Sequence, residues 1–172
     1  SPITAILLPR TPTCSSTVRI AAREGLPTIT GRVLLAFASA AVVIDINGAT
    51  PVVTSTQSMA TQRQWVTATL LADGRVLATG GSAVDNQLTN VNNTAAVWDP
   101  NGANGAGSWT IGPSQVNARL YHSGALLLPD ARVMIVGGGA PGPLNNTNIE
   151  MYTPSYLLDP NQPPPPNPPV LM

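Results

Sequence analysis

Tyr121 and His122 are neighbouring residues whose types suit chemistry at a metal ion. His122 is the single histidine of the 172 residues. A phenol and an imidazole together can offer copper one oxygen and one nitrogen donor. By itself, a lone histidine is more often a packed or solvated residue than a ligand. The pair is therefore a candidate metal site whose weight depends on the elements that present it.

Composition excludes several function classes. Charged residues make up only 9% of the chain, with eight basic and eight acidic side chains, so nothing favours nucleic acid or an anionic membrane as a partner. The longest apolar run, residues 33–43, is far shorter than the ~20 residues that span a bilayer, and no signal peptide starts there. One cysteine, Cys14, excludes an internal disulfide framework.

The sequence repeats itself. Residues 68–81, ATLLADGRVLATGG, align without a gap with residues 125–138, ALLLPDARVMIVGG, 57 positions further on. The 15 glycines, the 18 prolines and the many Ala, Val, Leu and Ile residues suit short strands joined by turns. We therefore expect an all-β protein built from repeated units.

Each repeat predicts one four-stranded antiparallel unit. An apolar strand leads into a tight turn at residues 72–74 or 129–131, where Gly74 accepts a positive φ and Ala131 is expected to be strained. A second strand ends in a Gly-Gly pair, where backbones can approach closely. A polar loop and an outer strand with an aromatic residue complete the unit, which is typical of a kelch-type β-propeller blade. A β-sandwich with two similar hairpins is the alternative.

About three such units fit into the chain, whereas closed propellers need four to eight blades. We expect residues 1–157 to form the C-terminal part of a propeller, and the Pro-rich residues 158–172 to be a linker toward a missing C-terminal domain. Both chain ends read as cuts through a longer protein. Residues 14–41 fit no blade pattern, which suggests a shifted reading frame or an irregular insertion.

The pair Tyr121-His122 runs directly into the first strand of its repeat. In a propeller this innermost strand lines the central channel, so the pair is expected at the channel mouth. Gln64 and Trp65 stand at the equivalent positions of the preceding repeat. The repeat framework therefore does not itself require a tyrosine and a histidine.

At this point a family resemblance becomes specific. Residues 119–139, RLYHSGALLLPDARVMIVGGG, resemble the metal-site blade of galactose oxidase and glyoxal oxidase, the copper-radical oxidases. The resemblance covers most of residues 43–172 and also residues 4–9. Residues 150–157, EMYTPSYL, are similar to the family's junction between propeller and C-terminal β-sandwich.

The resemblance implies roles for individual residues. Tyr121 corresponds to the axial tyrosine, a copper ligand and the base that takes the substrate hydroxyl proton, and His122 corresponds to one of two histidine ligands. The family's Tyr-Cys radical cofactor and its other histidine have no counterpart in this chain. We interpret Cys14 as structural or accidental, and Tyr152 and Tyr156 as packing residues.

The resemblance further implies a secreted, extracellular or periplasmic parent. With the rest of the propeller and a C-terminal β-sandwich as partners, that parent would oxidise a primary alcohol, sugar or small aldehyde with O2 to give H2O2. The fragment alone is expected to be inactive. Two alternatives stay open: a non-catalytic kelch module that binds carbohydrate or protein, and a truncated or frameshifted product that works only in assembly with other chains.

Overall fold

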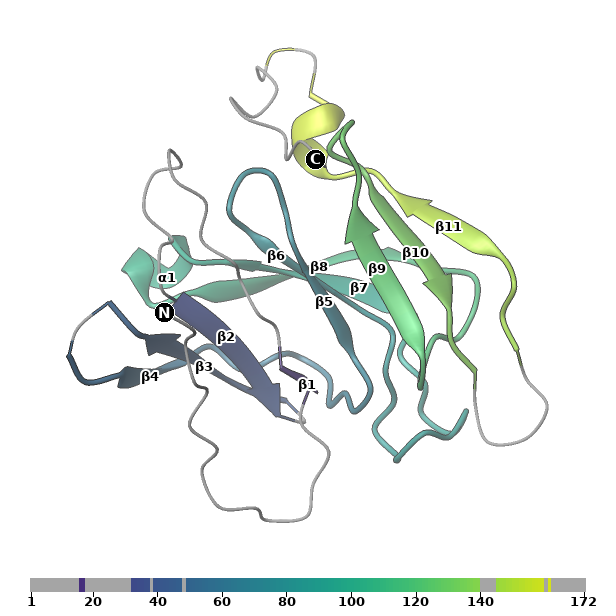
Figure 1. Cartoon of the computed structure of the whole chain (residues 1–172), viewed down its shortest axis with the longest axis horizontal. Helices are drawn as coiled ribbons and strands as arrows, with labels where there is room; N and C mark the ends of the chain where they lie inside the picture. The colour runs from purple at the N-terminus through teal and green to yellow at the C-terminus, as the bar shows by residue number, and fades with distance from the viewer. Residues whose placement is uncertain are drawn as a thin grey trace.

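A computed structural model describes residues 16–17, 32–37, 39–47, 49–139, 145–159 and 161. In this part of the chain the structure is all-β, with three antiparallel sheets (Figure 1). The first sheet contains β1 (Ser16–Thr17), β2 (Arg32–Phe37), β3 (Ala40–Asp45) and β4 (Val52–Thr56); the second contains β5 (Thr67–Leu70), β6 (Val76–Thr79), β7 (Thr94–Asp99) and β8 (Ser108–Ser114); the third contains β9 (Ser123–Leu127), β10 (Val133–Gly137) and β11 (Ile149–Tyr152). The helical elements are α1 (Gly102–Gly105) and the 3₁₀ turn η1 (Ser155–Leu157).

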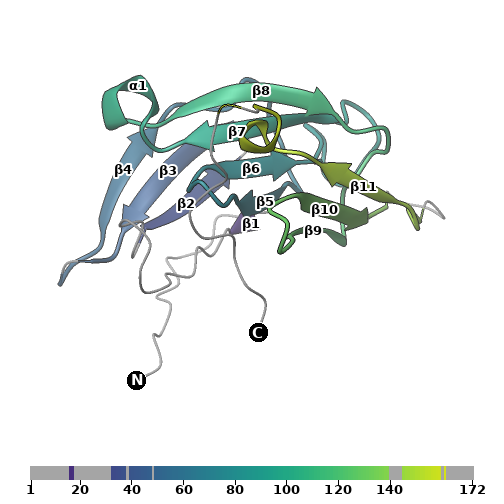
Figure 2. The same cartoon turned by 90° about the horizontal axis from the view of Figure 1, so that it is seen from above.

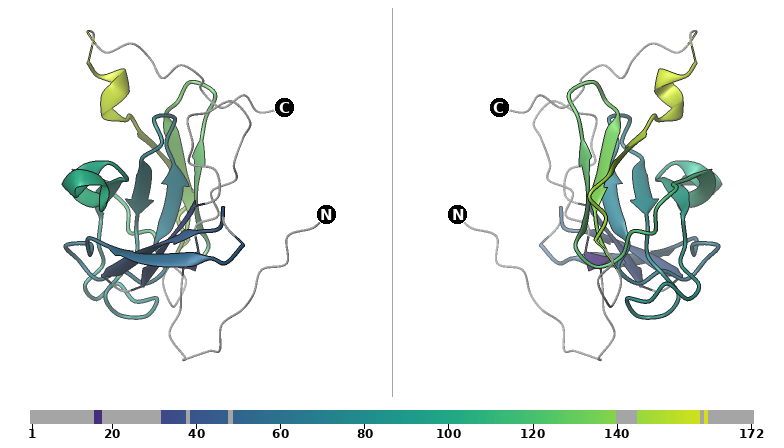
Figure 3. Two further views of the ribbon diagram at one scale, coloured as in Figure 1. Left: turned by 90° about the vertical axis from the view of Figure 1, so that its left-hand side faces the viewer. Right: turned by 90° about the vertical axis from the view of Figure 1, so that its right-hand side faces the viewer.

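The three sheets follow one another across the molecule, with the second sheet between the other two (Figure 1). Seen from above, β5 and β9 lie next to each other, whereas β8 and β11 lie farther apart (Figure 2). The strands of the first sheet run across those of the third (Figure 3). The hydroxyl of Thr69 on β5 donates to the Ala125 carbonyl on β9, so the second and third sheets are joined where their first strands meet.

The two middle strands of the second sheet, β6 and β7, are buried on both faces, which explains why most of their residues are apolar. Alternate residues of a strand point to opposite faces. On β7, Trp98 packs toward the first sheet and Ala96 toward the segment between β4 and β5. Ala95 and Val97 pack toward the third sheet. The same alternation on β6 sends Leu77 into the core that the second and third sheets share.

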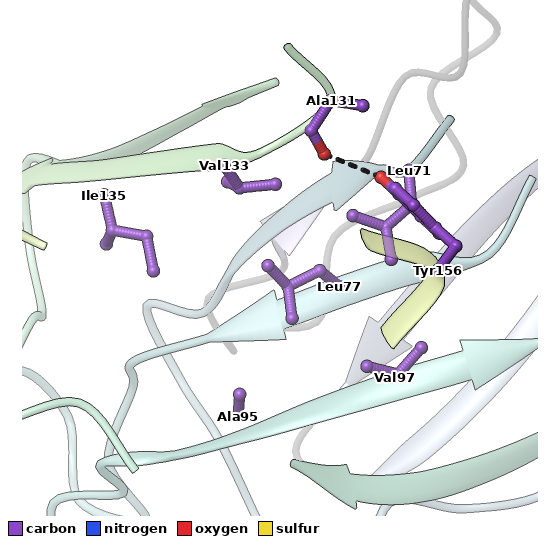
Figure 4. Close-up of a cluster of buried hydrophobic side chains, with 8 residues drawn as sticks. All are labelled: Leu71, Leu77, Ala95, Val97, Ala131, Val133, Ile135 and Tyr156. Carbon is purple, nitrogen blue, oxygen red and sulfur yellow. Dashed lines mark hydrogen bonds between the residues drawn. The ribbon is translucent and has the colours of Figure 1, made fainter. Parts of the chain in front are cut away.

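Tyr156 closes that shared core from η1 (Figure 4). Its ring is 2% exposed among Leu71, Leu77 and Val133, and its Oη donates to the Ala131 carbonyl at 2.8 Å. Burial raises the pKa of the Tyr156 phenol to about 12. Tyr152 on β11 packs half-buried against the same core, so both tyrosines are packing residues, as expected.

The repeated hairpins have the predicted geometry. Gly74 has a φ of 87°, and Ala131 has a φ of 65° in the equivalent turn. An alanine in this left-handed region costs roughly 1–2 kcal/mol. The Ala131 methyl group is 3% exposed in the core, and its burial offsets part of that cost.

Residues 14–41 are partly placed. Within this stretch, for which the sequence predicted no blade, β1 pairs with β2, and β2 pairs in turn with β3. The apolar run at 33–43 thus forms a hairpin at the centre of the first sheet, because each of its two halves is long enough for a strand. Residues 4–9, Cys14, and residues 160 and 162–172 of the expected linker lie outside the described residues. The described part contains no helix that is long and apolar enough to cross a membrane.

We predict that stability falls at alkaline pH through Tyr156. The Tyr156 phenol has a pKa of about 12 in the folded chain against 10.0 as the ordinary value, so folding favours its protonated form. Its contribution is complete below about pH 10 and is lost as the pH rises toward 12. All eight basic residues are arginines, so no lysine titrates in this range. Burial also raises the pKa of Tyr152, which acts in the same direction as Tyr156, whereas the lowered pKa of Arg63 acts in the opposite direction. Urea unfolding at pH 8, 10 and 11.5 measures the effect.

Tyr156→Phe should lose roughly 1 kcal/mol at pH 8, since the Ala131 carbonyl loses its hydrogen bond. The variant should also lose much of the alkaline dependence. An equally steep fall in the Phe variant would contradict the assignment.

Candidate functional site

Tyr121 and His122 occupy the last two positions before β9. Leu120, just before them, is 1% exposed, whereas Tyr121 is 44% exposed and His122 is also exposed. His122 has a φ of 63°, a left-handed conformation that few non-glycine residues adopt. The two rings stack with their centroids 3.7 Å apart and their planes 26° from parallel. A phenol and an imidazole therefore stand side by side on the surface.

Neighbouring groups hold this pair from the side of the second sheet. The ring of Trp65 packs edge-on against that of Tyr121, with centroids 4.8 Å apart. The Trp65 Nε1–H donates to Asp85, and the Tyr121 backbone N–H donates to the Asn86 side chain at 3.2 Å. The loop between β6 and β7 thus fixes both an aromatic wall and the backbone of the site.

Arg119 anchors the segment that carries the pair. Its side chain is 1% exposed and donates to the Gly137 carbonyl at 2.7 Å and to the Asn148 side chain at 2.7 Å. It also forms an ion pair of 3.0 Å with Glu150 on β11. The segment before Tyr121 is therefore tied to the ends of β10 and β11 that lie beside the start of β9.

The Gly-Gly pair of the second sheet holds the same segment from its other side. The Gly81 N–H donates to the Arg119 carbonyl at 2.9 Å. A Cβ on Gly80 would lie 2.3 Å from that carbonyl oxygen, and Gly80 has a φ of +69°. The predicted close approach of backbones is confirmed, and it occurs two residues before Tyr121.

The preceding repeat shows the same framework with other side chains. Arg63, 4% exposed, donates to the Gly80 carbonyl as Arg119 donates to that of Gly137. Trp65 has a φ of 59°, close to that of His122. Trp65 and His122 therefore occupy the same backbone position in the two repeats, as the sequence alignment placed them.

Glu150 is the acidic member of the Arg119 network. Its carboxylate accepts hydrogen bonds from the Val116 N–H at 2.7 Å and from the Asn117 N–H at 3.2 Å. Burial raises the pKa of the Glu150 carboxyl, but these bonds, with those from the Asn117 side chain and Arg119, outweigh it and hold the pKa below its ordinary value. The ionised Glu150 carboxylate thus binds the segment before Arg119 to β11 through hydrogen bonds.

The Tyr121-His122 pair offers a metal ion one phenol oxygen and one imidazole nitrogen as donors. Among the described residues no group of three or more His, Cys, Asp or Glu side chains lies close enough to hold a metal ion. The phenol and imidazole match the donor preferences of copper, and both are exposed to an incoming ligand.

Sequence reasoning found Tyr121 and His122 but missed the residues that position them. The two repeated arginines were a usable signal, because each stands just before a first strand. Asp85 and Asn86 carried no signal, since their loop differs between the repeats in sequence.

Comparison with known proteins gives likeness at the level of fold. No family model matches the chain, and no curated protein matches it. A fungal alcohol oxidase of the AA5 family, solved in complex with copper, aligns over 90% of this chain and 34% of its own length, with 22% identity and a TM-score of 0.70. The structure of YjhT aligns over 77% of this chain and 37% of its own, with 14% identity and a TM-score of 0.56. The chain thus shares the fold of part of each protein and spans about a third of their length.

Gly80→Ala should destabilise the chain by roughly 2–3 kcal/mol, because the new Cβ adds a backbone clash to the penalty of a positive φ. Gly105→Ala is the matched control: its φ is +87°, and nothing lies within 4 Å of the added Cβ. The control should cost only about 1 kcal/mol. Urea unfolding measures both free energies, and equal losses would refute the contact with Arg119 as the cause.

Glu150→Gln should flatten the acid side of the stability profile. Because the pKa of Glu150 is lowered from 4.5, its contribution is present above that value and is lost as the pH falls through the folded pKa. Urea unfolding at pH 7 and pH 4 should show a smaller difference for the Gln variant than for the wild type. An equal change in the free energy of unfolding between pH 7 and pH 4 in both proteins would contradict a stabilising role of the ionised Glu150 carboxylate.

Proposed function

We propose that this chain is the C-terminal part of a kelch-type β-propeller in a longer, copper-radical oxidase-like protein. Its three sheets would be successive blades, with β5 and β9 as the innermost strands of the last two. The observation that carries the proposal is the exposed, stacked pair Tyr121-His122, at a position where the preceding repeat has Gln64 and Trp65. The shared fold with a copper-complexed alcohol oxidase supports it.

The outer face of the third sheet supports a longer assembly. Leu126, Ile149 and Met151 are 47%, 60% and 41% exposed on that face. By strand register, Ile149 and Met151 correspond to Ala95 and Val97 of the second sheet, which the third sheet buries. A further blade would bury the outer face in the same way. A C-terminal β-sandwich domain or chain is the other proposed partner.

Within such a protein Tyr121 and His122 would bind copper through the phenol oxygen and an imidazole nitrogen. Copper there supplies one-electron redox chemistry. The Tyr121 Oη would also accept the hydroxyl proton of a primary alcohol, sugar or hydrated small aldehyde, while O2 is reduced to H2O2. Trp65, held by Asp85, would keep the Tyr121 ring in place.

Two donors bind copper weakly, so this chain alone would be inactive. The remaining ligand histidine and the Tyr-Cys radical cofactor would come from other segments of the longer protein. We propose a secreted, extracellular or periplasmic location. The alternative is a non-catalytic kelch module that binds carbohydrate or protein. The observation that favours it is that the described ranges contain no group of three or more His, Cys, Asp or Glu side chains that could hold a metal ion.

In the longer protein, His122→Ala should lower copper occupancy from about one per molecule to near zero. Tyr121→Phe should retain part of the copper but lose peroxide formation by roughly 100-fold or more, since positioned proton transfer contributes about 10²–10⁴-fold. Elemental analysis measures the copper, and a peroxidase-coupled assay with alcohols and aldehydes measures the H2O2.

Gln87→Ala, on an exposed loop position, is the matched control and should change neither quantity. A wild-type protein that takes up no copper would remove the oxidase proposal and leave the binding module. Stoichiometric copper with peroxide formation would remove the binding module.

A further inference from the structure

A second candidate site lies on the face of the second sheet that points away from the third sheet. A cavity of about 250 Å³ opens between β7, β8 and the segment that leads from β4 to β5. Arg63, Ala96, Ala60 and Thr61 are among its lining residues. Arg63 is 4% exposed, and its Nε has no hydrogen-bond partner in the described part of the chain. It is also the one charged residue among those that line the cavity.

The third sheet contains the same arrangement with a carboxylate in it. Glu150 accepts from the Arg119 guanidinium at 3.0 Å and from the backbone N–H groups of Val116 and Asn117 at 2.7 and 3.2 Å. The segment before β9, the buried Arg119 and β11 thus meet around the ionised carboxylate of Glu150. This is the pattern that a carboxylate-binding site requires.

Residue equivalence between the two sheets follows from hydrogen bonds and register. Arg63 donates to the carbonyls of Gly80 and Thr94, as Arg119 donates to those of Gly137 and Asn148. Two residues further along each third strand stand Ala96, paired with Ala78, and Glu150, paired with Ile135. Ala96 therefore stands where the third sheet has its carboxylate.

The donors of this site are also equivalent. Counting back from the arginines, Ala60 and Thr61 correspond to Val116 and Asn117. No hydrogen bond leads from the Ala60 or Thr61 backbone N–H to another described residue. Since Arg119 also has an unpartnered Nε, the difference between the two sites is the missing carboxylate rather than that nitrogen.

We propose that the cavity beside Arg63 binds a carboxylate group from outside the chain, in the place that the Glu150 side chain fills in the next sheet. The guanidinium of Arg63 and the N–H groups of Ala60 and Thr61 are its donors. The group is either a small free carboxylate or the acidic side chain of another segment or protein. The Ala96 methyl leaves the space that this group occupies.

Charge and burial favour this ligand chemistry. Burial lowers the pKa of Arg63 to about 10, so its cationic form lacks stabilisation by a counter-ion. A single carboxylate supplies that counter-charge and accepts hydrogen bonds from planar donors. A bound carboxylate also stabilises the folded chain by mass action. The site exists only in the folded chain, where the segment between β4 and β5 lies against β7.

The test is thermal unfolding of the full chain at pH 7 in sodium acetate and in sodium chloride of equal ionic strength. Acetate should raise the unfolding temperature by roughly 2–4 °C more than chloride and should saturate. Ala96→Glu should raise it already in chloride and lose the acetate response. Ala96→Gln, which fills the same space without charge, should lose the response and gain less stability.

Glu150→Ala provides an independent variant if the Ala96 variants fail to fold. It removes the internal carboxylate of the third sheet and should add a second acetate response, with a larger total shift than in the wild type. Equal effects of acetate and chloride on the wild type would overturn the proposal. An unchanged acetate response in Ala96→Glu would overturn it as well, since acetate would then bind elsewhere.

Two peptides distinguish the sources of the carboxylate. N-acetyl-Gly-Glu-Gly amide should stabilise the wild type, and the matching Gln peptide should not. Stabilisation by the Glu peptide at tenfold lower concentration than acetate would identify an acidic side chain as the natural occupant. An equal or stronger effect of acetate would identify a small free carboxylate. A Gln peptide as effective as the Glu peptide would contradict recognition of the charge.

Discussion

A buried arginine precedes the first strand of the second sheet and of the third sheet and ties the strands of that sheet together; the candidate site depends on the second of these arginines, Arg119. Arg119 reaches from the segment before Tyr121 to Gly137 and to Glu150 on the neighbouring strands, while its own carbonyl accepts from Gly81 of the second sheet. The side-chain partners all lie in the third sheet, whereas the backbone carbonyl joins the same segment to the second sheet. These contacts hold in place the backbone segment that leads into the exposed pair Tyr121-His122.

Burial of β6 and β7 in the second sheet on both faces is the other constraint. These two middle strands are mostly apolar because one face packs on the first sheet and the other on the third. The third sheet has the same register but leaves Ile149 and Met151 exposed on its outer face. Repetition thus links stability to neighbours: each sheet is complete only when another covers it.

Much of this architecture was predictable from the sequence, since hairpins and glycine pairs have local causes. Gly74 and Ala131 have the positive φ that the turn requires, and the all-β class followed from the repeat. The hairpin of β2 and β3 was not predicted, because a continuous apolar run does not mark its own turn. The Trp65–Asp85 contact was not predictable either, since it joins positions 20 residues apart through a loop with no repeat counterpart. The roles of Tyr121 and His122 stay predictions from family resemblance.

We propose that Tyr121 and His122 bind copper in a longer propeller protein. The most direct measurement is a crystal structure of the copper-loaded longer protein with diffraction data collected on both sides of the copper absorption edge. We predict one strong anomalous peak within bonding distance of the Tyr121 Oη and of a His122 ring nitrogen. A copper peak away from both side chains, or no peak in a fully loaded crystal, would contradict it.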